Sequence, residues 1–249
     1  ESLITEKTVA ILPVHEYGNV CNIEEIHRIA DKYGLKVIYD AAHAFGVRYK
    51  DRGIGCYGDA SIFSFHATKV FNTIEGGAVT FCDPKLFDKL YNLKNFGIRG
   101  EELVVDVGTN AKMNEFAAIM GLCNLKHADS EIKKRKEVFD CYIDNLSGIK
   151  GIKLLEPRHG ATRNYAYVPV YVTNEYRYTR DELYEELKKH NIFSRKYFFP
   201  LTCDQACFKN KYKLVELDNA RKLADRILTL PLFCGLSESV VNRIKRIMK

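Results

Sequence analysis

Apolar and polar positions in the first forty residues follow two different periods. Residues 9–14 and 35–39 are short apolar runs of strand length, and the segment 22–33 between them places isoleucines at the three- and four-residue spacing of one helix face. Asn22 stands where a helix N-cap belongs, and Gly34 follows as a stop signal. A strand, a helix and a strand in this order form a right-handed crossover between parallel strands. The pattern therefore predicts an α/β fold with a mainly parallel sheet.

More strands and helices are predicted in the same way up to about residue 128. Two further apolar runs have strand length, and two segments have the apolar spacing of a helix. Asn114 is the expected N-cap of the second helix. The predicted ranges are 61–65 and 78–81 for the strands and 84–96 and 114–125 for the helices. The inner face of the first helix is expected to consist of Leu86, Phe87, Leu90 and Leu93.

The pattern changes near residue 150. Residues 165–172 (YAYVPVYV) alternate like a strand that is covered on one face. Around this strand the pattern predicts helices at 129–145, 179–190, 218–228 and 237–248 and an extended run at 192–199. Such segregated strands and helices are typical of an α+β domain. We therefore expect a large domain at 1–128, followed by a linking helix and a smaller C-terminal domain at 129–249.

Composition describes an ordinary globular protein. The chain has 249 residues, of which 46% are hydrophobic and 28% are charged. It shows no signal peptide and no apolar run long enough to cross a membrane, so we expect a cytoplasmic protein without membrane contact. The eight cysteines are scattered, with no CxxC pair. We interpret them as reduced and structural, and we predict no metal site.

The charge is a mild excess of positive groups. The net charge of +6 is spread along the chain, which suits a phosphorylated ligand. No segment gathers basic and aromatic residues on one compact face, so nucleic-acid binding is not predicted.

Candidate chemistry lies at the ends of two predicted strands. Asp40 follows the strand 35–39, and Lys69 follows the strand 61–65. In an open α/β sheet, ligands collect just beyond the carboxyl ends of the strands. A lysine that forms a Schiff base, together with a carboxylate that keeps a pyridine nitrogen protonated, suits pyridoxal 5'-phosphate. From spacing alone, an ordinary Asp–Lys ion pair explains the two residues equally well.

The strings around these two residues resemble one family. DAAHAFG and GDASIFSFHATK, followed by EGGA, are similar to motifs of the DegT/DnrJ/EryC1/StrS sugar aminotransferases, a fold-type I branch of pyridoxal phosphate enzymes. Four more strings continue the resemblance in the family's order almost to the end of the chain: PVHEYGN at 13–19, GTNAKMNEFAAIMG at 108–121, SRKYFFP at 194–200 and LPLFCGLSESVV at 230–241.

The resemblance implies roles for the residues near the cofactor. Lys69 is implied to be the Schiff-base lysine and Asp40 the partner of the pyridinium nitrogen. His43 stands at the family's His or Gln position beside the ring, and Ser64 is implied to bind the cofactor phosphate. Asn110 resembles an asparagine that reaches the phosphate of the other subunit, so a homodimer with a shared active site is implied.

Two further residues are implied to contact the substrates. Lys112 stands where the family often has an arginine for the carboxylate of the amino donor, but a lysine lacks the planar two-bond contact of arginine. Tyr197 resembles an aromatic residue near the sugar, and a core or interface role fits it almost as well. His15 and Tyr17 either face the ligand crevice or belong to a structural turn.

The implied activity is transfer of an amino group from L-glutamate to a keto-deoxy sugar carried on a nucleotide diphosphate. A dTDP-4-keto-6-deoxyhexose, aminated at C4, is the favoured acceptor, and surface polysaccharide or glycoconjugate synthesis is the expected context.

Two alternatives remain open. The first is a pyridoxal phosphate-dependent sugar dehydratase, although those members of the family carry a histidine in place of Lys69. The second is a non-catalytic protein of the same fold. We consider this second alternative because the resemblance begins well inside the large domain of the family. It implies that the amino-terminal part of that domain is missing from this chain.

Overall fold

The computed structural model describes residues 1–209, 211 and 217–249. It divides into two compact units. The first holds Glu1–Ser130 and Pro157–Ala166, and the second holds Glu131–Glu156 and Tyr167–Lys249. The stretch Pro157–Ala166, which the sequence pattern places with the smaller domain, therefore groups with the first unit.

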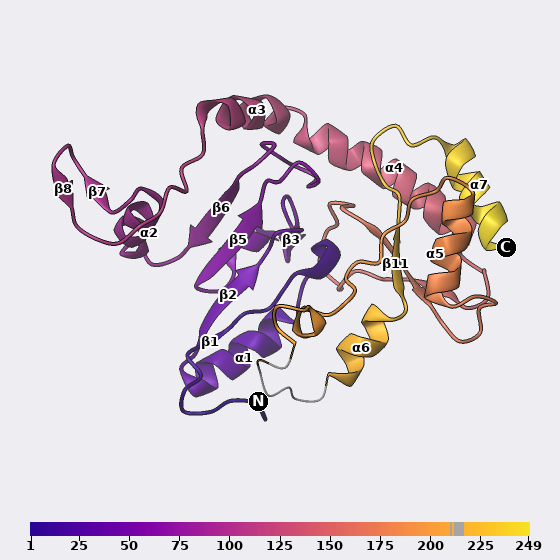
Figure 1. The fold of residues 1–249 in the computed structure, drawn as a ribbon, viewed down its shortest axis with the longest axis horizontal. Helices are drawn as coiled ribbons and strands as arrows, with labels where there is room; N and C mark the ends of the chain where they lie inside the picture. Colours follow the sequence, from indigo (N-terminus) through magenta and orange to yellow (C-terminus); the bar gives the residue numbers. More distant parts are fainter. Residues whose placement is uncertain (210, 212–216) are drawn as a thin grey trace. The chain divides into compact units, whose positions relative to one another are not determined.

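The first unit is built on a four-stranded sheet in the order β1-β2-β5-β6 (Figure 1). Its strands are β1 (Ala10–Ile11), β2 (Lys36–Asp40), β5 (Ala60–Ser64) and β6 (Gly77–Phe81). β1, β2 and β5 run parallel, and β6 lies antiparallel beside β5. The predicted α/β fold is thus confirmed. Because three strands run in one direction, their carboxyl ends meet at one edge of the sheet.

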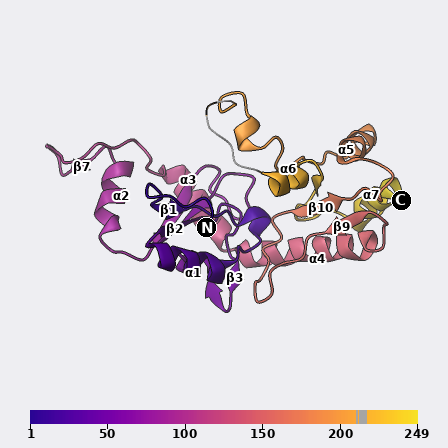
Figure 2. The same ribbon diagram turned by 90° about the horizontal axis from the view of Figure 1, so that it is seen from below.

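Helix α1 (Ile23–Tyr33) connects β1 to β2 and lies on one side of these strands (Figure 2). The Asn22 side chain accepts the Glu25 backbone N–H at 3.4 Å, and Gly34 ends the helix with a φ of 65°. The predicted start and stop signals are therefore confirmed. The helix completes a core that consists of Val20, Ile23, Ala30, Val37, Tyr39, Ala41, Ala44, Val47, Tyr49 and Ile54.

Short elements fill the connections of this sheet. They are the 3-10 turns η1 (Glu16–Gly18) and η2 (Ile54–Cys56) and the hairpin strands β3 (Arg48–Tyr49) and β4 (Arg52–Gly53). Tyr49 forms an antiparallel bridge with Ala161. This bridge attaches Pro157–Ala166 to the first unit.

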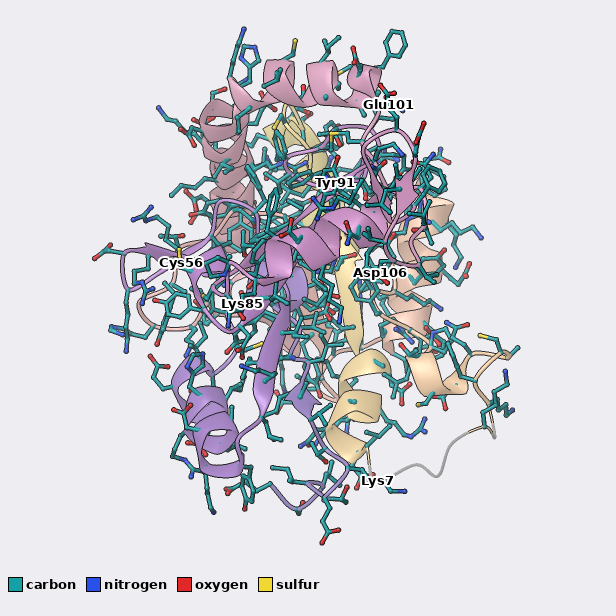
Figure 3. All side chains as sticks on the ribbon, turned by 90° about the vertical axis from the view of Figure 1, so that its left-hand side faces the viewer. Lys7, Cys56, Lys85, Tyr91, Glu101 and Asp106 are labelled. Atoms are coloured by element: carbon teal, nitrogen blue, oxygen red, sulfur yellow. The ribbon has the colours of Figure 1, made fainter. Side chains whose placement is uncertain are left out.

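After β6 the chain forms helix α2 (Leu86–Lys94), the hairpin β7 (Ile98–Arg99) and β8 (Leu103–Val104), and helix α3 (Glu115–Leu125). Figure 3 shows α2 toward the viewer, with Lys85 at its start, Tyr91 on it, and Glu101 and Asp106 in the hairpin region. The Arg99 guanidinium lies 4.7 Å from the Tyr91 ring centroid and 2.7 Å from the Asp88 carboxylate. These contacts fasten the hairpin to α2.

The apolar face of α2 differs from the prediction, and α3 also exposes apolar residues. The expected inner face of α2 is not buried, since Phe87 is 61% exposed and Leu93 is 43% exposed. In α3 only Ala117 and Gly121 are buried, although most of the helix is apolar. The first unit therefore leaves apolar helix surface uncovered.

The second unit has a separate antiparallel sheet in the order β11-β10-β9. Its strands are β9 (Ile152–Leu154), β10 (Val168–Val172) and β11 (Ile227–Leu230). Its helices are α5 (Arg180–Lys189), α6 (Asp218–Ala224), α7 (Glu238–Met248) and most of α4 (Ala128–Leu146), with the 3-10 turn η3 (Thr202–Asp204). The helix predicted at 218–228 is wrong at its end, because residues 227 and 228 belong to a fully buried strand. Over the described residues, no helix has the length and apolarity needed to cross a membrane.

Candidate active site

The carboxyl ends of the parallel strands bring the predicted site residues to one edge of the sheet. Val14, just after β1, forms a parallel bridge with Asp40, and Asp40 is in register with Ile62 of β5. β5 ends at Ser64, and the loop behind it carries Lys69. Residues from three strand ends therefore converge, as the sequence predicts for Asp40 and Lys69.

The loop that carries Lys69 is held by its own backbone and by an aromatic cluster. The Lys69 N–H donates to the His66 carbonyl at 2.9 Å, and the Thr73 N–H donates to the Phe65 carbonyl at 2.9 Å. The Phe71 ring stacks on Phe45 with a centroid distance of 4.4 Å and packs edge-on against Phe65 at 4.9 Å. These contacts hold the loop backbone in place, so they also fix the position of the Lys69 backbone.

The Lys69 amine is half-buried and has no fixed partner. In the part of the chain that the structure describes, no hydrogen bond or ion pair engages its Nζ atom. Burial lowers the pKa of the Lys69 ammonium below its ordinary value, while the charges of Asp40 and Glu16 act on it in the opposite direction. Both carboxylates therefore lie within electrostatic reach of the amine, but neither is locked to it.

Asp40 is also only partly engaged. One carboxylate oxygen, Oδ1, accepts the backbone N–H of Ala42 at 3.0 Å. Among residues 1–209, 211 and 217–249, no cation is paired with this carboxylate. The ordinary Asp40–Lys69 ion pair that spacing left open is therefore absent from the described structure.

His43 lies in the loop after β2, three residues beyond Asp40, and is held from two sides. Its Nδ1 atom accepts the backbone N–H of Tyr17 at 3.2 Å and lies 3.5 Å from the Glu16 carboxylate. The carbonyl of His43 accepts a hydrogen bond from the Asn164 side chain at 2.8 Å, and Asn164 donates to the Phe45 carbonyl at 2.9 Å. The loop after β2 is thereby anchored by a residue far along the chain.

Glu16 and Asn164 are two site residues that sequence reasoning misses. Glu16 lies within PVHEYGN, two residues after the predicted strand 9–14, and this position at a strand end is a sequence signal that could have found it. Asn164 is 2% exposed and gives no such signal, because its partners lie more than one hundred residues earlier in the chain.

Ser64 has a hydroxyl that is only weakly used within the protein. It ends β5, and its oxygen accepts the His66 backbone N–H at 3.4 Å. No contact with a second hydroxyl, amide or charged group is found for it in the described chain. The hydroxyl hydrogen is thus available to an anionic ligand at the strand end.

Asn110 and Lys112 contact each other rather than Lys69. The Lys112 Nζ donates to the Asn110 Oδ1 at 2.8 Å and lies 4.4 Å from the Phe96 ring centroid. Both residues are exposed, and over the described ranges neither contacts Asp40. Their segment lies near the lysine loop, since a Cβ on Gly76 would come within 2.6 Å of the Met113 side chain.

Tyr197 belongs to the second unit. There its ring packs edge-on against Tyr167 at 6.1 Å and stacks on Phe198 at 4.6 Å. Both of these ring contacts lie within the second unit.

The sequence of the whole chain, residues 1–249, matches the DegT/DnrJ/EryC1/StrS aminotransferase family. The chain belongs to this family. The members of the family are pyridoxal phosphate-dependent aminotransferases, so the resemblance stated from the motifs is confirmed.

Two curated relatives indicate the kind of substrate that similar proteins use. The dTDP-4-amino-4,6-dideoxy-D-glucose transaminase of Shigella dysenteriae is 42% identical over 98% of this chain and 66% of the relative. The GDP-perosamine synthase of Escherichia coli O157:H7 is 32% identical over 97% of this chain and 65% of the relative. The chain thus spans slightly less than two thirds of the length of these relatives.

The fold also matches a solved structure. The crystal structure of DesI, determined in the presence of its TDP-sugar product, superposes with a TM-score of 0.92 at 32% identity. The match covers 99% of this chain and 63% of the DesI chain.

The groups at the strand ends fit pyridoxal phosphate. A half-buried amine without a partner, a carboxylate with one unused oxygen and a serine hydroxyl match the aldehyde, the pyridine nitrogen and the phosphate of that cofactor. Glu16 Oε1 is buried without a hydrogen-bond donor in the described structure, which leaves a further acceptor at the same edge.

Proposed function

We propose that this protein is a pyridoxal phosphate-dependent aminotransferase that acts on a nucleotide-linked keto sugar. The observation that carries the proposal is the Lys69 amine, which is partly buried, unpaired in the described structure and within electrostatic reach of Asp40. A structural lysine at a strand end would be expected to pair with the nearest carboxylate. An amine kept free of such a pair suits covalent attachment of an aldehyde.

Lys69 is proposed as the attachment point and as the acid and base of the reaction. Bound pyridoxal phosphate supplies an aldehyde that combines with amino groups and a ring that withdraws electrons from the bond to be broken. Burial lowers the pKa of the Lys69 ammonium, so a larger fraction of the amine is neutral and can accept a proton from the substrate carbon. The nearby charges of Asp40 and Glu16 help it to hold that proton until it is returned.

Asp40, Ser64 and His43 are proposed to position the cofactor. The Asp40 carboxylate retains an oxygen that can accept a hydrogen bond from a protonated pyridine nitrogen. The Ser64 hydroxyl can donate to a phosphate oxygen. The Nδ1 atom of His43 accepts the Tyr17 backbone N–H, and the imidazole is proposed to lie beside the cofactor ring.

The proposed amino donor is L-glutamate, and the proposed acceptor is a dTDP-4-keto-6-deoxyhexose aminated at C4. The name of the Shigella dysenteriae relative, at 42% identity, supports a dTDP-linked 4-amino sugar. Lys112, now held by Asn110, is proposed to bind the donor carboxylate as a point charge. Tyr197 is proposed to contact the sugar, and the product is expected to enter surface polysaccharide or glycoconjugate synthesis in the cytoplasm.

A homodimer is proposed to complete the site. Asn110 is exposed, and it is proposed to reach the cofactor phosphate of the second copy. The uncovered apolar residues of α3 support a second copy as the covering surface, because a soluble monomer rarely exposes a contiguous apolar helix.

The test is the visible spectrum of purified protein mixed with pyridoxal phosphate, recorded before and after L-glutamate is added. The proposal predicts a band of lysine-bound cofactor that is lost when glutamate is added. A band that glutamate does not change would indicate another pyridoxal phosphate reaction, such as sugar dehydration. No band at all would indicate a non-catalytic protein. Lys85→Ala, an exposed lysine at the start of α2, is the control and should retain the band.

A further inference from the structure

The loop that carries Lys69 is packed against helix α3. This lysine loop, residues 65–76, joins β5 to β6, and α3 passes beside it (Figure 1). A Cβ on Gly121 of α3 would lie 2.7 Å from the Thr73 Cγ2 atom and 3.9 Å from the Phe71 Cζ atom. Only a residue without a side chain fits such a close approach, so α3 and the lysine loop are in direct contact.

One side chain of α3 joins the two segments by a hydrogen bond. The Asn124 side-chain NH2 group donates to the Asn72 carbonyl at 2.9 Å, across 52 residues of the chain. Asn124 lies three residues beyond Gly121, so both residues are on the face of α3 that meets the loop. Asn72 itself is only three residues after Lys69. The hydrogen bond therefore reaches the backbone close to the proposed attachment point of the cofactor.

The backbone beyond Asn72 is strained. Ile74 has a φ of 68°, a conformation that β-branched residues rarely adopt. The Asn72 Oδ1 atom accepts the Ile74 N–H at 3.3 Å, which supports the turn from within the loop. Strained residues persist where surrounding contacts determine the backbone, and they gather at functional sites. Asn124 supplies such a contact from outside the loop.

This turn determines where Lys69 lies. The Thr73 N–H donates to the Phe65 carbonyl at 2.9 Å and closes the loop around Lys69. Thr73 is 3% exposed, so this closure is buried against α3. The Lys69 Nζ atom has no partner in the described structure, so the loop backbone sets its place. A loop that opened at Thr73 would free the amine to move.

We propose that Asn124 is a positioning residue whose hydrogen bond to Asn72 holds the turn after Lys69 and thereby fixes the amine for attachment to the cofactor aldehyde. The proposal rests on the proposed function in one respect, the role of Lys69 as the attachment point. Asn124 suits this task, because its amide donates to a backbone carbonyl and carries no charge. It can therefore hold the loop without altering the charges that act on Lys69.

The first test needs no cofactor. Hydrogen exchange of the unliganded protein, followed by mass spectrometry, reports the protection of the Thr73 amide. Asn124→Ala should raise its exchange rate about three- to tenfold, the effect of one lost hydrogen bond, and Asn124→Gln, which keeps a side-chain NH2 group, should recover part of the protection. Asn145→Ala is the matched control, since it removes a side-chain hydrogen bond to the Cys141 carbonyl at 2.8 Å in the second unit. Unchanged exchange at Thr73 in Asn124→Ala, or a rise of equal size over the whole first unit, would overturn the proposal.

The second test separates attachment of the cofactor from its binding. Asn124→Ala should slow the appearance of the lysine-bound band about three- to tenfold after pyridoxal phosphate is added, and Asn124→Gln should recover part of the rate. Its affinity for 4'-deoxypyridoxine 5'-phosphate, which has no aldehyde, should stay equal to that of wild type. Equal rates in Asn124→Ala and wild type, or an equal loss of analogue affinity, would contradict a positioning role. If wild type forms no band, the proposed function fails, while the exchange of Thr73 still decides whether Asn124 holds the loop.

Discussion

At the scale of single residues, two opposing effects on the pKa of the Lys69 amine define the site. Burial lowers the pKa of Lys69, and the charges of Asp40 and Glu16 limit that decrease. An amine in this environment exchanges a proton more readily than an ordinary surface lysine does. Glu16 is therefore part of the site, although the sequence did not identify it as a candidate.

Glu16→Gln should lower the pKa of Lys69 further. The variant removes one of the two negative charges that favour the ammonium, so the amine becomes neutral at a lower pH. The pH dependence of Lys69 modification by trinitrobenzenesulfonate, followed by peptide mass spectrometry, measures this change. Glu75→Gln, an exposed carboxylate in the same loop, is the control. A modification profile displaced to higher pH in Glu16→Gln would contradict the assignment.

His15, which is 0% exposed, should make the protein less stable in acid. Unfolded histidine binds a proton near its ordinary pKa of 6.5, whereas burial lowers the pKa of folded His15 to about 4. Between these values the unfolded state binds more protons, so the free energy of unfolding falls as pH falls. The contribution is up to about 3 kcal/mol over this window. Urea denaturation across the window should show a steeper loss in wild type than in His15→Phe, and parallel profiles would refute this explanation.

The sequence predicts the site residues that lie near strand ends. It misses the residues whose contacts join segments that are distant in the sequence. Asp40 and Lys69 each follow an apolar run, so the topology brings them together. The contacts of Asn164 and Asn124 depend on packing between distant segments, which no local pattern records.

At the scale of elements, the sequence predicts helix starts reliably where an N-cap side chain is present. Asn114 accepts the Ala117 N–H at 2.8 Å, as predicted for an N-cap. The predicted helix wrongly includes residues 227 and 228. No glycine or proline separates the helix from the apolar run that follows it, so the hydrophobic pattern predicts that the helix continues. There the pairing of β11 with β10 decides the structure.

Gly18 should tolerate substitution less well than Gly34. Both have a positive φ, 84° and 65°, so alanine is strained at either position. A Cβ on Gly18 would lie 2.8 Å from the Asn164 Oδ1 and 3.0 Å from the His43 carbonyl, whereas a Cβ on Gly34 would meet nothing within 4 Å. We expect a loss of about 1 kcal/mol for Gly34→Ala and of about 2 to 3 kcal/mol for Gly18→Ala. Thermal unfolding of both variants compares them, and equal losses would show that the close approach is unimportant.

At the scale of the whole molecule, uncovered apolar surface is the feature that the sequence predicts least well. The pattern places the apolar residues of α2 on an inner face, but Phe87 is 61% exposed. In α3, Phe116 is 85% exposed and Leu122 is 66% exposed. Periodicity identifies an apolar face without saying whether the same chain covers it. A second copy of the chain is the proposed cover.

Phe116→Asp should weaken self-association. A charge in the middle of a proposed apolar contact must be desolvated, so dimers become less stable. Sedimentation velocity over a range of protein concentrations should show a dimer for wild type and a shift toward monomer for the variant. Phe193→Asp is the control, since Phe193 is 65% exposed in the second unit. A wild-type protein that remains monomeric at every concentration would contradict the proposed homodimer.

The most direct test of the proposed chemistry is to locate the covalent attachment of the cofactor. Purified protein is mixed with pyridoxal phosphate, treated with borohydride to make the link permanent, digested and mapped by mass spectrometry. The result predicted here is a phosphopyridoxyl group on Lys69, absent when Lys69→Ala is treated in the same way. A modification spread over surface lysines, or one that persists at a different single lysine in Lys69→Ala, would contradict the central role of Lys69.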